Sequence, residues 1–125
     1  MSNNESQHGK GYIAAGEAGA TVVKYTLQWA WEDPESGIAT PLTFNINSDI
    51  PVPSFKSKAA PGDNLLDVKY DAKLGKPNGL SEFKGVVGSE KLFIKIPKWN
   101  IVIKGPIEGG PELGADFVGH GNWIG

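Results

Sequence analysis

Few residues of this chain have side chains suited to nucleophilic or acid–base catalysis. Cysteine is absent and there are two histidines, His8 and His120, so a nucleophile with a neighbouring base would have to use one of these imidazoles. No Gly-x-Ser-x-Gly segment is present to expose a serine on a strand-to-helix turn. His8 lies in a polar N-terminal segment and His120 lies among glycines, where a surface position is the ordinary interpretation. We therefore predict that the protein is not an enzyme.

Carboxylates are the more frequent groups with acid–base chemistry. Glu32, Asp33 and Glu35 come together at one expected turn, and Asp67 and Asp71 lie on the same face of one expected strand. Two carboxyl groups about 5–10 Å apart are the arrangement that hydrolyses glycosidic bonds. Lysines alternate with the two aspartates along their face, as on a solvated sheet surface with cross-strand charge pairs. This pattern favours a surface role over catalysis.

Calcium is the metal ion that best suits these oxygen ligands. The candidate positions are the turn with Glu32, Asp33 and Glu35, and the pair Asp63 and Asn64. Neither matches the spacing of the twelve-residue calcium loop. An aspartate in a turn also commonly accepts a hydrogen bond from the backbone two residues further on. We expect no cofactor and no metal site, with calcium at one of these turns as the alternative.

The chain has four tryptophans in 125 residues. Tryptophan is the one side chain in excess here that commonly binds ligands. The face of an indole ring can stack on a sugar, while neighbouring carboxylates or amides bond its hydroxyl groups. Trp31 lies near Asp33 and Glu35, and Trp123 follows Asn122. These five residues form the predicted ligand-binding set. Core packing is the more common interpretation of both rings, because large aromatic side chains are mostly buried.

The predicted function is therefore a non-enzymatic, lectin-like binding module with a glycan as its ligand. The alternative is a structural or assembly protein that forms homo-oligomers, such as a virion, toxin-complex or inclusion component. That alternative rests on a polar N-terminal arm and a glycine-rich C-terminal tail, both of which could reach a neighbouring subunit.

Charge and hydropathy narrow the range of other partners. All twelve basic residues are lysine and the net charge is −2, so we expect no nucleic-acid partner, because arginine dominates such contacts. No apolar run has the length of a transmembrane helix. Residues 91–104 place lysines among aliphatic residues, and we interpret them as a strand with snorkelling lysines rather than a membrane-binding surface. The N-terminus lacks the apolar segment of a signal peptide, so we expect a cytoplasmic protein, with export by another route left open.

Alternation of apolar and polar residues predicts the strands that must position these side chains. It holds over residues 21–32, where Val23, Tyr25, Leu27, Trp29 and Trp31 share a face, and over residues 38–46 and 66–74, and it is weaker over 80–87. Turn residues at 33–37 and 75–79 predict two hairpins.

A change of phase beside Pro97 interrupts the alternation of residues 91–104. It predicts a bulge or a bend at which the strand passes from one sheet to another. A tight turn between two short strands is the alternative.

No segment of useful length has helical periodicity, and 39% hydrophobic and 21% charged residues are ordinary for a globular domain. We predict a disordered polar tail over residues 1–10, a last short strand over 115–118, and a single all-β domain over residues 11–125. The predicted architecture is a jelly-roll-like antiparallel β-sandwich, with a closed β-barrel as the alternative.

Overall fold

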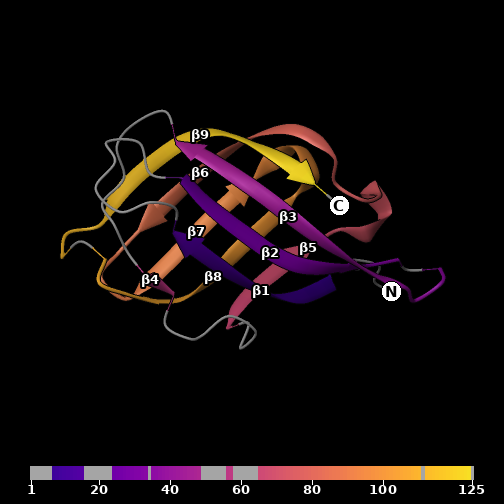
Figure 1. Ribbon diagram of the computed structural model, residues 1–125, viewed down its shortest axis with the longest axis horizontal. Coiled ribbons are helices and arrows are strands. Elements are labelled where there is room, and N and C mark those ends of the chain that lie inside the picture. The colour runs from indigo at the N-terminus through magenta and orange to yellow at the C-terminus, as the bar shows by residue number, and fades with distance from the viewer. Residues whose placement is uncertain are drawn as a thin grey trace, which may run out of the picture.

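The computed structural model describes residues 7–15, 24–33, 35–48, 56–57, 65–110 and 112–124, and the observations below concern these residues. They form nine strands and two short 3-10 helices, η1 and η2 (Figure 1). The elements are β1 (Gln7–Ala15), β2 (Lys24–Glu32), β3 (Ala39–Ser48), β4 (Lys56–Ser57), β5 (Leu66–Tyr70), η1 (Ala72–Leu74), β6 (Gly79–Val87), β7 (Lys91–Ile96), η2 (Pro97–Trp99), β8 (Ile101–Glu108) and β9 (Ala115–Ile124).

Eight of these strands close into an antiparallel β-barrel. Their order around the barrel is β1, β2, β3, β9, β6, β7, β8 and β5, and β5 pairs again with β1. The two-residue β4 pairs with β8 outside this ring. The all-β prediction is confirmed, and the closed barrel, rather than the sandwich, is the architecture. A barrel of this strand number is just wide enough for side chains to fill its interior.

The predicted inner faces point into the barrel wherever the strands are regular. Tyr25, Leu27 and Trp29 of β2 are 4% exposed or less. The inward apolar residues of the next two regular strands are buried as well: Leu42, Phe44 and Ile46 of β3, and Leu66, Val68 and Tyr70 of β5. Two residues assigned to these faces are exposed instead, Ile38 at 65% and Leu74 at 47%. Ile38 precedes β3 and Leu74 lies in η1, so both lie beyond the ends of the strands that the alternation predicted.

β5 and β6 do not pair, although the turn between them predicted a hairpin. β5 lies between β1 and β8, and β6 lies between β7 and β9. The chain crosses the end of the barrel through η1, where the Asp71 carboxylate accepts a hydrogen bond from the Lys73 backbone N–H at 3.0 Å. Gly79 then begins β6 with a φ of 72°, a left-handed conformation that suits glycine.

The change of phase beside Pro97 marks a tight turn, not a bulge. η2 reverses the chain, the Asn100 N–H donates to the Pro97 carbonyl at 3.1 Å, and Asn100 takes a φ of 52°. β7 and β8 then pair as a hairpin, starting with Ile96 opposite Ile101. Both isoleucines point inward, although one has an even and the other an odd residue number. The reason is that the turn between them, residues 97–100, has an even number of residues. The predicted bulge is wrong and the alternative, a tight turn, is confirmed.

Both terminal strands are longer than the sequence indicated. β1 begins at Gln7, so residues 7–10 belong to the barrel rather than to the predicted tail, and β9 continues to Ile124 instead of ending at residue 118. Several inner positions of both strands are glycines. A Cβ on Gly9 would lie 3.2 Å from the Trp29 ring, and one on Gly121 would overlap the Phe44 ring. These glycines make room for large rings, and they leave no apolar signal in the sequence.

Candidate functional site

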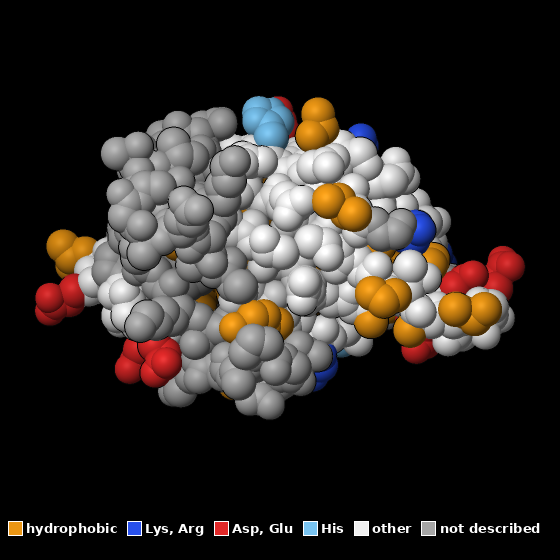
Figure 2. All heavy atoms as spheres, in the orientation of Figure 1, with side chains coloured by type: hydrophobic (Ala, Val, Ile, Leu, Met, Phe, Trp, Pro, Cys, Tyr) orange, Lys and Arg blue, Asp and Glu red, His pale blue; other side chains and the backbone are white. Residues whose placement is uncertain are grey.

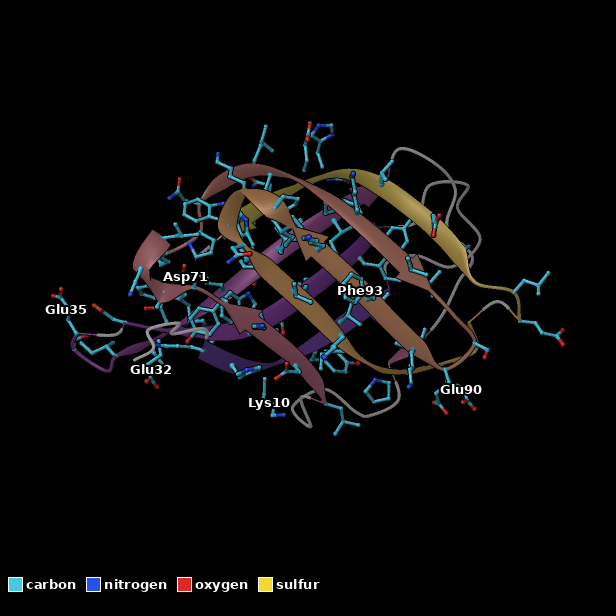
Figure 3. The ribbon with its side chains drawn as sticks, turned by 180° about the vertical axis from the view of Figure 1, so that it is seen from behind. Lys10, Glu32, Glu35, Asp71, Glu90 and Phe93 are labelled. Carbon is cyan, nitrogen blue, oxygen red and sulfur yellow. The ribbon has the colours of Figure 1, made fainter. Side chains whose placement is uncertain are left out.

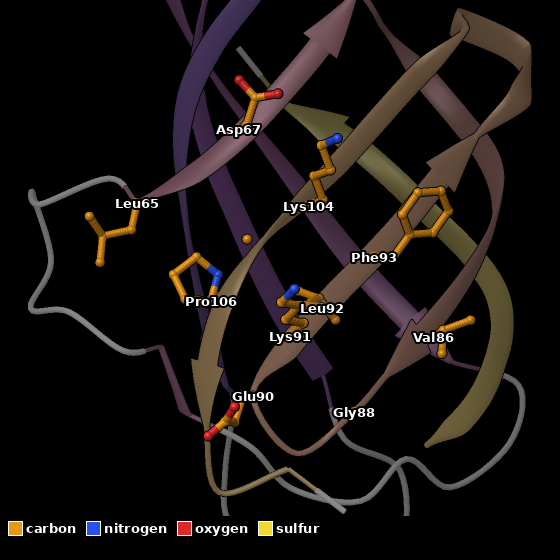
Figure 4. A pocket seen from close by; sticks show the side chains of 11 residues that line it. Leu65, Asp67, Val86, Gly88, Glu90, Lys91, Leu92, Phe93, Lys104 and Pro106 are labelled. Carbon is orange, nitrogen blue, oxygen red and sulfur yellow. The ribbon is translucent and has the colours of Figure 1, made fainter. Parts of the chain in front are cut away.

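An open groove of about 820 Å³ lies on the outside of the barrel (Figure 4). It crosses β5, β8, β7 and β6 near the turn that joins β6 to β7. The side chains that line it and carry the argument below are Leu65, Asp67, Val86, Lys91, Phe93, Lys104 and Pro106. Because these residues lie on strands of the closed barrel or directly beside them, the sheet fixes the spacing of their Cα atoms.

One row of outward side chains crosses the groove. Asp67 of β5 is opposite Lys104 of β8, Lys104 is opposite Phe93 of β7, and Phe93 is opposite Val86 of β6. Directly opposed residues have Cβ atoms about 4.5–5.5 Å apart. Lys104 therefore lies between Asp67 and Phe93, as Figure 4 shows.

Several apolar side chains in this groove are exposed to solvent. Phe93 is 42% exposed, Val86 is 43% exposed and Leu65 is 47% exposed, and Pro106 lies opposite Lys91 in the register. Exposed apolar side chains that gather in a groove with a polar rim are typical of interaction sites.

A second row, one pleat along, is basic. Lys69 of β5 is opposite Val102, Val102 is opposite Lys95, and Lys95 is opposite Lys84 of β6. Like charges directly opposite one another destabilise a sheet. In the part of the chain that the structure describes, none of these three lysines has a carboxylate within 4.0 Å.

The opposite face of the barrel has a different character. The outward positions of β2 and β3 include Thr26, Gln28, Thr43 and Asn45, all uncharged. Figure 2 shows this face, on which charged side chains lie mainly at the edges and hydrophobic ones are scattered. Lysines are thus concentrated on the face that has the groove.

The two predicted aromatic platforms are buried. Trp31 is 8% exposed and Trp123 is 6% exposed. The Trp123 indole N–H donates to the Ser81 hydroxyl at 3.2 Å, and its ring lies 4.5 Å from the Phe44 ring between centroids. Core packing, the ordinary interpretation of large aromatic side chains, applies to both rings. Ring faces turned into the barrel cannot stack on a sugar outside it.

The other members of the predicted set do not lie in the groove either. The Asp33 carboxylate accepts a hydrogen bond from the Glu35 N–H at 2.9 Å, which is the ordinary turn chemistry of aspartate. Figure 3 shows that Glu35 and Glu90, which lines the groove, lie at the two opposite ends of the barrel. Asn122 is exposed whereas its neighbour Trp123 points inward, so one ligand outside the barrel cannot contact both side chains. A ligand-binding role for the five residues stays a prediction.

Metal ligands are not gathered in the described part of the chain. Its histidines and carboxylates include no group of three or more that could hold a metal ion. The predicted calcium ligands Asp63 and Asn64 lie outside the described residues. No helix in the described ranges has the length and hydrophobicity needed to cross a membrane.

Sequence reasoning missed the groove, although a signal for it was present. Along β7, Leu92, Ile94 and Ile96 point inward and Phe93 lies between them on the outward face. An aromatic residue in the polar phase of a strand indicates an exposed ring. The interpretation of this segment as a buried face with snorkelling lysines is correct for the inward residues only.

The comparisons with known proteins add no relative. No family model matches the chain, no curated protein sequence matches it, and no solved structure matches it.

Proposed function

We propose that the protein is a non-enzymatic binding module and that its ligand lies in the groove over β5, β8, β7 and β6. The carrying observation is the pair of Phe93 and Val86, which are opposite in register and 42% and 43% exposed. Covering such side chains with a ligand removes apolar surface from water, at about 25 cal/mol for each Å². Both side chains are therefore suited to anchor a ligand.

The barrel supports this function by holding the groove rigid. The strands beneath it are hydrogen-bonded on both sides, because the sheet is closed. The inward neighbours of Phe93, Leu92 and Ile94, are 1% exposed or less. A site on a rigid scaffold loses little conformational entropy when it binds.

A glycan, the ligand class that the tryptophans suggested, has weaker support at this groove. Phe93 is the one aromatic ring among the described lining residues on which a sugar could stack. Most of the lining is apolar, and the Asp67 carboxylate already contacts His8 Nδ1 at 3.0 Å. Sugars require many hydrogen bonds to their hydroxyl groups, so this lining favours a ligand with apolar side groups.

Screening of wild-type protein against a glycan array and a random peptide library tests this proposal. We expect at least one ligand, and we expect Phe93→Ser to weaken its binding by about tenfold or more, the effect of losing an anchor residue. The matched control is Ile38→Ser, which removes a 65% exposed apolar side chain outside the groove and should leave affinity unchanged. Ligands that bind Phe93→Ser as well as wild type, or the absence of any ligand, would refute a binding site in this groove.

Self-association is the second candidate function, and one observation favours it. Leu80 of β6 and Ile124 of β9 are 68% and 52% exposed. Leu80 is opposite Asn122, so Ile124 is its diagonal neighbour on the outer surface. Neither residue lines the groove, so this surface could bury a second copy independently of ligand binding.

Sedimentation velocity over a wide concentration range tests self-association. If these side chains form an interface, wild-type protein sediments as a dimer or larger species, and Leu80→Ser shifts it to monomer. Val86→Ser is the matched control, because Val86 is also exposed but lies in the groove. A monomer at every concentration would exclude this candidate.

A further inference from the structure

We propose that the ligand of the groove is an extended acidic segment of a partner protein, with a large apolar side chain between its acidic residues. This inference rests on the proposed function and goes beyond it, because it assigns the chemical class of the ligand. Three features carry it: the excess of outward lysines on the strands that form the groove, the lack of carboxylates paired with them, and the spacing of charge around Phe93.

Lysines outnumber carboxylates at the outward positions of β5, β6, β7 and β8. The outward lysines on its four strands are Lys69, Lys84, Lys91, Lys95 and Lys104, whereas the outward carboxylates on the same strands are Asp67, Glu82 and Glu108. Glu90, in the turn between β6 and β7, also lines the groove. The chain as a whole has a net charge of −2. The positive charge of this face is thus a local feature, and a surface of this kind attracts and orients an acidic ligand.

The carboxylates do not neutralise these lysines within the described structure. Asp67 is opposite Lys104 in the register, yet its carboxylate contacts His8 Nδ1 at 3.0 Å. Glu82, which also faces outward on β6, lies 3.7 Å from His120 Nε2. Lys84 and Lys95 are directly opposed, and this repulsion opposes folding unless an anion lies between them. A bound carboxylate would relieve it.

The spacing along β7 matches an extended peptide. Lys91, Phe93 and Lys95 all point outward, with one inward residue between each pair. Alternate residues of a strand are about 6.6 Å apart, and the same spacing separates alternate residues of an extended ligand. A segment of the pattern acidic-x-apolar-x-acidic therefore places a carboxylate near each lysine and its apolar side chain on Phe93. Extended segments bind protein surfaces in this way, with alternate side chains entering the site.

Other anionic ligands fit these features less well. A nucleic acid or a sulfated glycan would satisfy the lysines but would leave Val86 and Leu65, which are 43% and 47% exposed, without an apolar partner. An anionic lipid surface is flat, whereas the exposed apolar side chains lie in a groove. A peptide satisfies the charged and the apolar parts together.

Fluorescence anisotropy with a labelled peptide of about nine residues, centred on Glu-Thr-Phe-Thr-Glu, tests the proposal on the full chain. Two comparison peptides replace both glutamates by glutamine or both by lysine. We expect the glutamate peptide to bind at least about tenfold more tightly than the glutamine peptide at low salt, with the difference falling as salt screens the charges.

Charge reversal on the protein is the second part of this binding experiment. Lys95→Glu should weaken binding of the glutamate peptide by about tenfold and should improve binding of the lysine peptide, which a mere loss of structure would not do. Lys73→Glu is the matched control, because Lys73 is exposed but lies in η1, outside the groove, and its effect should stay below about twofold. Phe93→Ser should weaken binding of all three peptides.

The outcomes separate this inference from the proposed function. Equal affinity for the glutamate and glutamine peptides, with Phe93→Ser still weakening both, would overturn the acidic ligand and leave the binding module intact. Binding of a sulfated oligosaccharide or of anionic lipid vesicles in place of the glutamate peptide would also overturn it. If no probe and no library member binds through Phe93, both proposals are wrong.

Discussion

Gly121→Ala is expected to destabilise the protein by about 3 kcal/mol, although it adds a single methyl group. Gly121 points into the barrel from β9 opposite Ile46, and a Cβ there would overlap the Phe44 ring. Phe44 cannot move aside easily, because it is 0% exposed and packs at 4.5 Å from Trp123 and 6.3 Å from Phe83 between ring centroids. The free energy of unfolding, measured with urea, gives the size of the effect.

Two further variants show whether the ring is the cause. Phe44→Leu in the Gly121→Ala background should cost much less than the sum of the two single changes, because it removes the atoms that the methyl group meets. Gly114→Ala is the matched control: its nearest neighbour would be 3.7 Å away, and the cost should stay within about 0.5 kcal/mol. An additive double mutant would disprove the proposed overlap.

The strands that the sequence predicted best are those whose inward residues are all large. In β2 and β3 the alternation identified the inward residues correctly from Tyr25 to Trp31 and from Leu42 to Ile46. It failed in β1 and β9, where Gly9 and Gly121 occupy inner positions against the rings of Trp29 and Phe44. Glycine has no side chain and is therefore neither apolar nor polar in the alternation. That it makes room for an aromatic ring becomes evident only in the three-dimensional structure.

Alternation assigns a residue to a face but does not identify the neighbouring strand. The hairpin of β2 and β3 has a short turn and was predicted correctly. The contacts that close the barrel, between β5 and β1 and between β3 and β9, join segments far apart in the sequence. No local signal specifies these pairs, and the same strands were therefore compatible with a sandwich.

The candidate site was misplaced for a related reason. Trp31 shares the phase of Tyr25, Leu27 and Trp29, and it was a candidate for an exposed platform because it lies at the end of its strand, beside the acidic turn. The barrel continues past that point on β5, which only β1 separates from β2: the Tyr70 hydroxyl accepts a hydrogen bond from the Glu32 N–H at 3.2 Å. Side chains from β5 thus cover the end of β2, and the rings that appeared available for a ligand stabilise the core instead.

Trp123→Ala should lower the free energy of unfolding by about 3–5 kcal/mol, as for other large core aromatics. The change removes ring contacts with Phe44 and with Trp29, whose centroid lies 6.3 Å away. It also removes one of the two indole N–H groups that donate to Ser81, the other being that of Trp99 at 3.1 Å. Denaturation in urea measures the change.

Trp123→Phe tests the same prediction in a variant that retains a ring. Its cost should be smaller, about 1–2 kcal/mol, because it removes the hydrogen bond to Ser81 and part of the packing. Phe93→Ala, at a 42% exposed ring in the groove, should cost about 0.5 kcal/mol or less while weakening ligand binding. If Trp123→Ala were instead neutral for stability, the indole would not be part of the core, and the predicted sugar platform would regain its basis. We expect instead that stability depends on Trp123 and that ligand binding depends on Phe93. Trp123 then belongs to the core inside the barrel, and the ligand binds on the outer surface.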